Sequence, residues 1–184
     1  MSDLRELGLS ARNYDAAAMQ PSAKTTAVLL GRHMDTEELV ADFIRVANLA
    51  GVVLLRDAVD VEVLRAPHCP RSLPAGRMGA YVFLWGDECL KVGKAGPSSH
   101  ARYRYQHYRP GSSNSNLAKS ILKEPGRLGI SGIDESNVGK WIKGNTDRVN
   151  ILLDDDAGMP VLNLLEAFLQ CRLKPRFEGS DSQR

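Results

Sequence analysis

Long apolar runs are absent from this sequence. Nowhere do about eighteen uncharged apolar residues follow one another, so we expect no membrane-spanning helix and no membrane partner. The first residues, Met1–Glu6, contain acids and no apolar core, which is not the pattern of a secretory signal peptide. These absences together favour a cytoplasmic protein.

Cysteine is scarce, with three residues at Cys69, Cys89 and Cys171. They are too few and too scattered for a disulfide framework, and none belongs to a C-x-x-C pair of the kind that builds structural zinc sites. The glycine-rich signatures G-x-x-x-x-G-K-[ST] and G-x-G-x-x-G are missing too, so nothing indicates a nucleotide-dependent small-molecule enzyme.

Charge is plentiful but unevenly distributed. Residues 90–148 hold eleven Lys or Arg and four acids, a local charge of +7, while the whole chain carries only +2. Such segregation is typical of a surface that binds a polyanion such as a nucleic acid. A basic face that is merely solvated is the alternative interpretation.

Residues 1–70 are predicted to form an N-terminal extension or a small α/β region. Asp35 stands three residues before Glu38, the spacing of a capping box, and apolar residues then recur at three- and four-residue steps. Apolar runs with alternation at Val59, Val61 and Val63 indicate strands. The predicted parts are an arm (1–24), a helix (about 36–50) and strands (about 52–64).

The second half is predicted to be an α/β domain over residues 79–179. Three prolines and a glycine within residues 66–78 exclude a regular element, and we place a linker at 71–78. The domain should contain a small three-stranded antiparallel sheet flanked by helices. Its strands are expected near residues 80–85, 89–93 and 148–153, the first two joined by a turn at Gly86-Asp87-Glu88. A polar tail is expected at 180–184.

Four fragments of this half carry chemistry when taken together. Gly79-Ala80-Tyr81 lies on the first expected strand and Lys91-Val92-Gly93-Lys94 on the second. A basic, aromatic helix follows, and the last helix holds Glu166 ahead of Lys174-Pro175-Arg176-Phe177-Glu178. The residues of interest on the basic helix are Arg102, Arg104, His107 and Tyr108.

The order of these fragments resembles the GIY-YIG nuclease superfamily over roughly residues 77–179. In that family a Gly-x-Tyr strand pairs with a Tyr-x-Gly strand, an arginine helix follows, and a glutamate precedes a Lys-Pro-x-x-Asn ending. This chain departs from the pattern at Lys91, which replaces the second tyrosine, and at Glu178, which replaces the closing asparagine. The resemblance implies a metal-dependent nuclease with a three-stranded antiparallel sheet.

The residue types also suit phosphodiester hydrolysis without reference to a family. A lone carboxylate such as Glu166 can anchor Mg²⁺ (or Mn²⁺), with water and phosphate oxygens filling the other positions. An arginine can donate two hydrogen bonds to a phosphate and keeps its charge. Tyr81, Lys91 and His107 are the candidates for the general base, and the residues alone do not choose between them.

Two arginines compete for the catalytic position. Arg104 and Tyr108 are i, i+4 neighbours on the expected helix, which favours Arg104 as the catalytic arginine and leaves Arg102 as a phosphate contact. Lys94, Tyr108 and Lys119 complete the set predicted to bind substrate.

The sequence therefore predicts a divalent-metal-dependent DNA endonuclease, with restriction or defence against foreign DNA as the expected setting. DNA is the expected partner, and double-strand cleavage with one site per chain would require a homodimer. A repair or single-strand-specific nuclease is one alternative. A nucleic-acid-binding protein that lost catalysis through the change at Lys91 is another.

Overall fold

A computed structural model describes residues 34–113 and 116–177 of the chain. The predicted arm at 1–24, the tail at 180–184 and the substituted position Glu178 lie outside the described residues. In the described part no helix combines the length and apolarity that crossing a bilayer requires.

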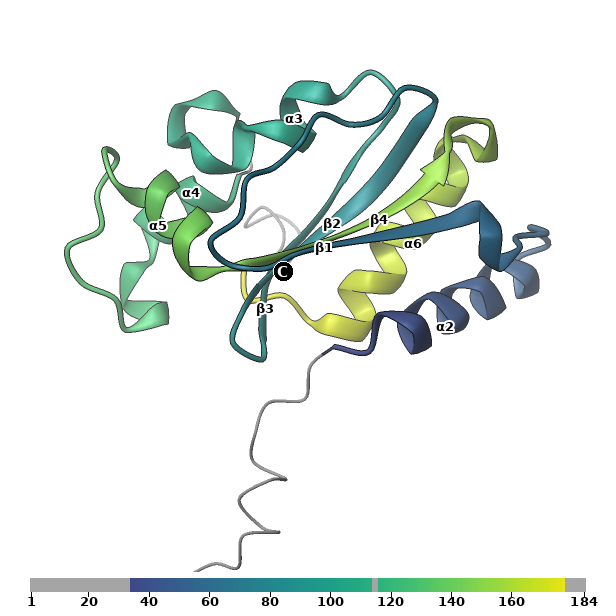
Figure 1. Ribbon diagram of the computed structural model, residues 1–184. Helices are drawn as coiled ribbons and strands as arrows, with labels where there is room; N and C mark the ends of the chain where they lie inside the picture. Colours follow the sequence, from purple (N-terminus) through teal and green to yellow (C-terminus); the bar gives the residue numbers. More distant parts are fainter. Residues whose placement is uncertain (1–33, 114–115, 178–184) are drawn as a thin grey trace, which may run out of the picture. The chain divides into compact units, whose positions relative to one another are not determined.

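The centre of the structure is a four-stranded antiparallel sheet (Figure 1). Its strands are β1 (Val59–Leu64), β2 (Arg77–Trp85), β3 (Glu88–Ala95) and β4 (Asp147–Asp154), arranged in the order β1-β4-β2-β3. The predicted α/β class is confirmed, but the prediction of three strands is wrong. The fourth strand is β1, which pairs with β4 from Val59 opposite Leu153 to Leu64 opposite Arg148.

The burial of β4 explains why it needs two neighbours. Residues Arg148 to Leu153 are all buried, so both faces of this strand are covered, and β2 and β1 satisfy its backbone on either side. The other expected N-terminal strand does not form. Val53 and Leu55 are mostly exposed, and residues 52–55 have no regular structure, because no neighbouring strand pairs with them.

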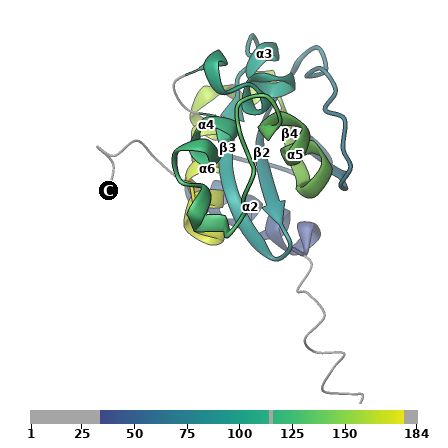
Figure 2. The same cartoon turned by 90° about the vertical axis from the view of Figure 1, so that its left-hand side faces the viewer.

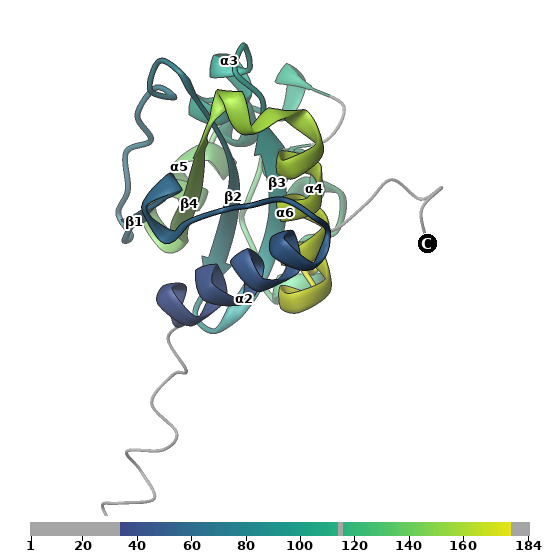
Figure 3. The same ribbon diagram turned by 90° about the vertical axis from the view of Figure 1, so that its right-hand side faces the viewer.

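Helices cover both faces of the sheet. Figure 3 looks onto the face covered by α2 (Thr36–Leu49) and α6 (Gly158–Leu173). Figure 2 looks onto the face covered by α3 (His100–Arg104), α4 (Leu117–Lys123) and α5 (Val138–Asn145). Alternate residues of β2 divide between the two layers: Met78, Ala80 and Val82 pack under α2 and α6, whereas Tyr81 and Phe83 face the other helices.

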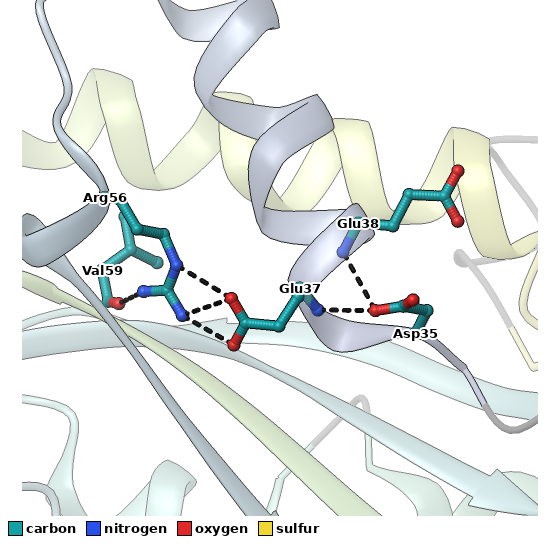
Figure 4. A network of polar contacts seen from close by, with 5 residues as sticks. All are labelled: Asp35, Glu37, Glu38, Arg56 and Val59. Atoms are coloured by element: carbon teal, nitrogen blue, oxygen red, sulfur yellow. Dashed lines mark hydrogen bonds and ion pairs between the residues drawn. The ribbon is translucent and has the colours of Figure 1, made fainter.

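The start of α2 matches its predicted capping box (Figure 4). The Asp35 carboxylate accepts hydrogen bonds from the backbone N–H groups of Glu37 and Glu38, both at 3.0 Å. The Arg56 guanidinium donates hydrogen bonds to the Glu37 carboxylate at 2.8–3.1 Å and a further one to the Val59 carbonyl oxygen. These contacts join the first turn of α2 to the first residue of β1.

Residues 34–64 are thus part of the same sheet and core as the second half of the chain. The Phe43 side chain is 1% exposed and packs against Phe168 of α6, with ring centroids 5.8 Å apart. The expected linker also packs, because Leu73 and the preceding His68 are buried and β2 begins at Arg77. After α6, the N–H groups of Arg176 and Phe177 donate to β3 carbonyls at 2.9 Å.

Phe43→Ala tests whether the two halves fold as one unit. We expect a loss of about 3–5 kcal/mol in the free energy of unfolding, since the change leaves a cavity between α2 and α6. Trp85 and Trp141 contact each other edge to face on the opposite face of the sheet, so their fluorescence reports on the other layer. The fluorescence and circular-dichroism transitions should shift together. Val53→Ala, at an 89% exposed position, is the control and should change stability by less than about 0.5 kcal/mol.

Candidate functional site

The β2–β3 hairpin brings the first two sequence fragments side by side. A turn was predicted over Gly86-Asp87-Glu88, and the structure has one at Gly86-Asp87, one residue shorter because β3 already begins at Glu88. Gly86 takes a positive φ of 59°. The register places Tyr81 directly opposite Gly93. A Cβ atom at position 93 would lie 2.5 Å from the Tyr81 hydroxyl oxygen, so the phenol lies across bare backbone and needs glycine there.

The Tyr81 hydroxyl is the centre of a buried polar group. Its oxygen accepts a hydrogen bond from Arg102 Nε at 3.0 Å and lies 2.6 Å from His107 Nε2. Tyr81 itself is fully buried. Burial raises the pKa of Tyr81 to about 12, and the nearby guanidinium groups of Arg102 and Arg148 only partly oppose this effect. The side chain is therefore a neutral phenol at neutral pH.

His107 lies in the short 3-10 turn Gln106–Tyr108 that follows α3, and its side chain is 1% exposed. Its Nδ1 accepts from the Leu117 N–H at 3.4 Å, which places the ring proton on Nε2, facing the Tyr81 oxygen. Burial, then the positive charges of Arg148, Arg102 and Lys91, hold the pKa of His107 well below its usual value. His107 is consequently a neutral hydrogen-bond donor.

Arg102 is fixed at one end and available at the other. Its Nε donates to both the Tyr81 oxygen and the Lys94 carbonyl oxygen, at 3.0 and 3.1 Å. Its two terminal nitrogens have no hydrogen-bond partner among the described residues. A guanidinium anchored through Nε presents its remaining donors in a fixed direction, which is the geometry that suits a phosphate.

Arg102 lines a surface pocket of about 480 Å³, whereas Tyr81 and His107 are buried and reach it only through their contacts with one another and with Arg102. The pocket is lined by Lys94 of β3, by the loop from Gly96 to Ser99, by Arg102 of α3 and by Met159 and Glu166 of α6. The Lys94 ammonium forms an ion pair with the Glu166 carboxylate, and both side chains are more than half buried. Two cations and one carboxylate therefore meet at one opening.

The structure places Arg102 and Arg104 in different surroundings. Helix α3 ends at Arg104, so the i, i+4 relation between Arg104 and Tyr108 never forms, and the preference for Arg104 is not supported. Arg104 is exposed and its guanidinium contacts Ser72, outside the pocket. Arg102, which the sequence analysis made a secondary contact, is the arginine that the fold places beside Tyr81 and Glu166.

Three other predicted residues lie away from the pocket lining. Lys91 is 4% exposed, and its ammonium donates to the Phe177 carbonyl oxygen at 3.1 Å. Tyr108 is buried, where its hydroxyl contacts His68 Nε2 at 2.8 Å and receives a bond from Arg148. Lys119 is exposed on α4. Of the predicted set, the fold gathers Tyr81, Lys94, Arg102, His107 and Glu166.

The sequence analysis missed a polar network behind the site. Arg148 and Asn150 are buried on β4, and Asn150 donates to the Glu62 carboxylate on β1 at 2.8 Å. The signal was present in the sequence, because two polar residues alternate with apolar ones in a strand that is otherwise apolar. When polar and apolar residues alternate along a buried strand, the polar ones line up on one face of the sheet.

For a divalent ion, the pocket fits a site with a single protein ligand. In the described residues no group of three or more His, Cys, Asp or Glu side chains could hold a metal, so an all-protein cage is not present there. Glu166 offers a hard carboxylate oxygen at the pocket, which is the donor that Mg²⁺ prefers, and Mg²⁺ commonly keeps water and substrate oxygens in its other positions. Lys94 would share the carboxylate with the ion.

Comparisons with known proteins add no relative. No family model matches the chain, and no curated protein or solved structure is similar to it at the significance threshold. The chemical interpretation of the pocket therefore rests on its own residues: a fixed guanidinium, an ammonium, a carboxylate and a neutral phenol–imidazole pair behind them.

Gly93→Ala tests the contact on which the site is built. The added methyl group would meet the Tyr81 ring and hydroxyl at 2.5–2.7 Å, so the phenol must move, and we expect a loss of about 1–3 kcal/mol in stability. Gly144→Ala is the matched control, because nothing lies within 4 Å of its Cβ position in α5. That variant should be neutral or slightly stabilising in the same thermal unfolding measurement. Equal stability of the two variants would contradict the close approach of Tyr81.

Proposed function

We propose that this chain is a divalent-metal-dependent endonuclease that hydrolyses phosphodiester bonds in DNA, with a site of the GIY-YIG type. The observation that carries the proposal is the pocket in which Arg102, held through Nε by Tyr81, faces Glu166 and Lys94. A phosphodiester needs cationic donors for its non-bridging oxygens and a carboxylate for a metal ion, and this pocket offers both.

The sequence fragments that resemble the superfamily support this proposal through their positions. Gly79-Ala80-Tyr81 and Lys91-Val92-Gly93 lie on paired strands, Arg102 follows on α3, and Glu166 is on α6 at the same pocket. Strands β3, β2 and β4 make the three-stranded antiparallel arrangement that the resemblance implies, and β1 extends it. Glu178, the second departure from the pattern, lies outside the described residues.

Each side chain has a distinct part in this proposal. The terminal nitrogens of Arg102 bind a non-bridging phosphate oxygen, and Lys94 adds a second positive charge beside it. Glu166 would hold the divalent ion, which when bound supplies positive charge at the phosphate and lowers the pKa of a coordinated water. The ion pair with Lys94 holds the Glu166 carboxylate at the pocket.

Tyr81 is the remaining candidate for the general base. Lys91 is directed to the Phe177 carbonyl, and His107 is a neutral donor with its second nitrogen engaged by Leu117. The hydrogen bond and charge of Arg102 at the Tyr81 oxygen favour the phenolate, but burial has the larger effect, so Tyr81 is a neutral phenol that would have to lose its proton before acting as a base. In the neutral form, its first role is to hold Arg102 in place.

One observation favours the alternative of a binding protein without catalysis. The Glu166 carboxylate already has a cationic partner in Lys94, so the pocket can hold a phosphate through Arg102 with no metal present. The pure protein incubated with plasmid or single-stranded DNA, with magnesium, manganese or chelator, decides between the functions. Binding without cleavage in every metal would favour the binding protein, and cleavage of single strands alone would favour a single-strand-specific nuclease.

Arg102→Ala and Arg104→Ala distinguish the two arginines. Removing Arg102 should slow cleavage by on the order of a hundredfold or more, the scale of losing one preorganised charge-stabilising donor. Removing Arg104 should leave the cleavage rate within about threefold of wild type and weaken DNA binding mainly at low salt, because its exposed charge acts as an outer phosphate contact. Initial rates on a plasmid at two salt concentrations measure both effects. The reverse pattern would return the catalytic role to Arg104.

Glu166→Gln tests the metal requirement. The amide has nearly the same size but no charge, so metal-dependent cleavage should be lost, while DNA binding in chelator should be retained or strengthened because Lys94 is released. Binding is measured by fluorescence anisotropy with EDTA, and cleavage with increasing Mg²⁺. Glu135→Gln, at an exposed position away from the pocket, is the control and should behave as wild type. Full cleavage by Glu166→Gln would remove this residue from the site.

A further inference from the structure

Arg148 is a fully buried arginine directly behind the candidate site. It lies on β4 opposite Phe83 of β2, on the sheet face that carries Tyr81, and it is 0% exposed. It is the largest of the side chains that are fully buried in the described part of the chain. Removing a charged group from water is costly unless neighbouring groups compensate for the lost hydration.

The partners of Arg148 leave its charge without a direct counter-ion. Its Nε donates to the Asn150 side-chain oxygen at 2.8 Å, and Nη1 donates to the Tyr108 hydroxyl at 3.2 Å. The third nitrogen, Nη2, is buried and has no hydrogen-bond partner among residues 34–113 and 116–177. None of the ion pairs found among the described residues includes Arg148, and the Glu62 carboxylate is reached only through Asn150.

Three aromatic rings take the place of a carboxylate. The guanidinium carbon lies 4.6 Å from the ring centre of Tyr103, 5.3 Å from that of Tyr81 and 5.4 Å from that of Phe83. Such contacts attract a cation to the electron-rich face of each ring without neutralising it. Tyr81 is therefore held by a guanidinium at each end: Arg102 at its hydroxyl and Arg148 against its ring.

We propose that Arg148 is a positioning residue for the site: its buried guanidinium holds the Tyr81 ring, so that the Tyr81 hydroxyl, which also contacts His107, keeps Arg102 directed into the pocket. The part that concerns DNA cleavage rests on the proposed function. The part that concerns His107 stands on the contacts and charges of the described residues alone.

The surroundings of His107 support this role from every element packed against it. Tyr81 of β2 faces Nε2, Lys91 approaches from β3, Arg102 from α3 and Arg148 from β4, while the Leu117 N–H of α4 faces Nδ1. Three of these groups are cations, and each of them opposes protonation of the imidazole. Arg148 has the largest effect of the three. A charged His107 would have no carboxylate among these neighbours to receive its second proton.

The test is an NMR measurement of the imidazole nitrogens of His107 across pH, which reports both tautomer and protonation. In the wild-type protein we expect a neutral ring at pH 6.5, with the proton on Nε2. In Arg148→Met, which keeps the length of the side chain and removes the charge, the pKa of His107 should rise by about one pH unit, the lower end of the range for one nearby charge. Arg148→Lys keeps the charge and should keep His107 neutral. Arg109→Met, which removes an exposed charge stacked on Tyr105, is the control for a change of net charge.

The outcomes separate this inference from the proposed function. A wild-type His107 that is charged at pH 6.5, or that carries its proton on Nδ1, overturns the inference whether or not the protein cuts DNA. An unchanged pKa of His107 in folded Arg148→Met also overturns it. If Arg148→Met does not fold, Arg148→Lys decides: protonation of its His107 at pH 6.5 counts against the inference. In a protein that cleaves DNA, Arg148→Met should be slower by about a hundredfold, the scale for a displaced reacting group, and a wild-type rate would overturn the positioning role.

Discussion

The contact between the Tyr81 ring and the bare backbone of Gly93 determines how the rest of the site is arranged. Because Gly93 has no side chain, the Tyr81 phenol can lie against the backbone of β3, and its hydroxyl reaches Arg102. Arg102 in turn is held by the Lys94 carbonyl, and Lys94 holds Glu166 on the last helix. This one contact on the hairpin thus fixes groups that come from two other segments, α3 and α6.

The two faces of the sheet differ in the residues that they bury. The face under α2 and α6 is apolar, with Val40, Phe43, Met78 and Leu165 among its buried residues, and it supplies hydrophobic stabilisation. The opposite face carries the buried polar groups, including Arg148, His107 and Tyr108. Removing one member of a buried polar network costs more stability than the complete network contributes. The hydrophobic stabilisation of the face under α2 and α6 therefore offsets the cost of burying polar groups on the opposite face.

Local features were predictable from the sequence, and long-range ones were not. The Asp35 cap and the Gly86-Asp87 turn depend on neighbours within a few residues, and both form, the turn one residue shorter than predicted. The pairing of β1 with β4 joins residues about ninety positions apart, and nothing in a local pattern encodes it. The i, i+4 relation between Arg104 and Tyr108, on which the preference for Arg104 rested, does not form for a related reason. The sequence pattern predicts a helix that continues past Arg104, whereas α3 ends at that residue and a 3-10 turn then changes the direction of the chain.

The short segment after α6 has a consequence for the sheet as a whole. Strand β3 lies at an edge, and the N–H groups of Arg176 and Phe177 bond to its outward carbonyls at Cys89 and Leu90. At the other edge, β1 alternates Val59 and Val61 with the acids Asp60 and Glu62. An edge whose acceptors are occupied, and another that carries like charges, are poor templates for an added strand. The short segment after α6 and the acids of β1 therefore also protect the protein against edge-to-edge aggregation.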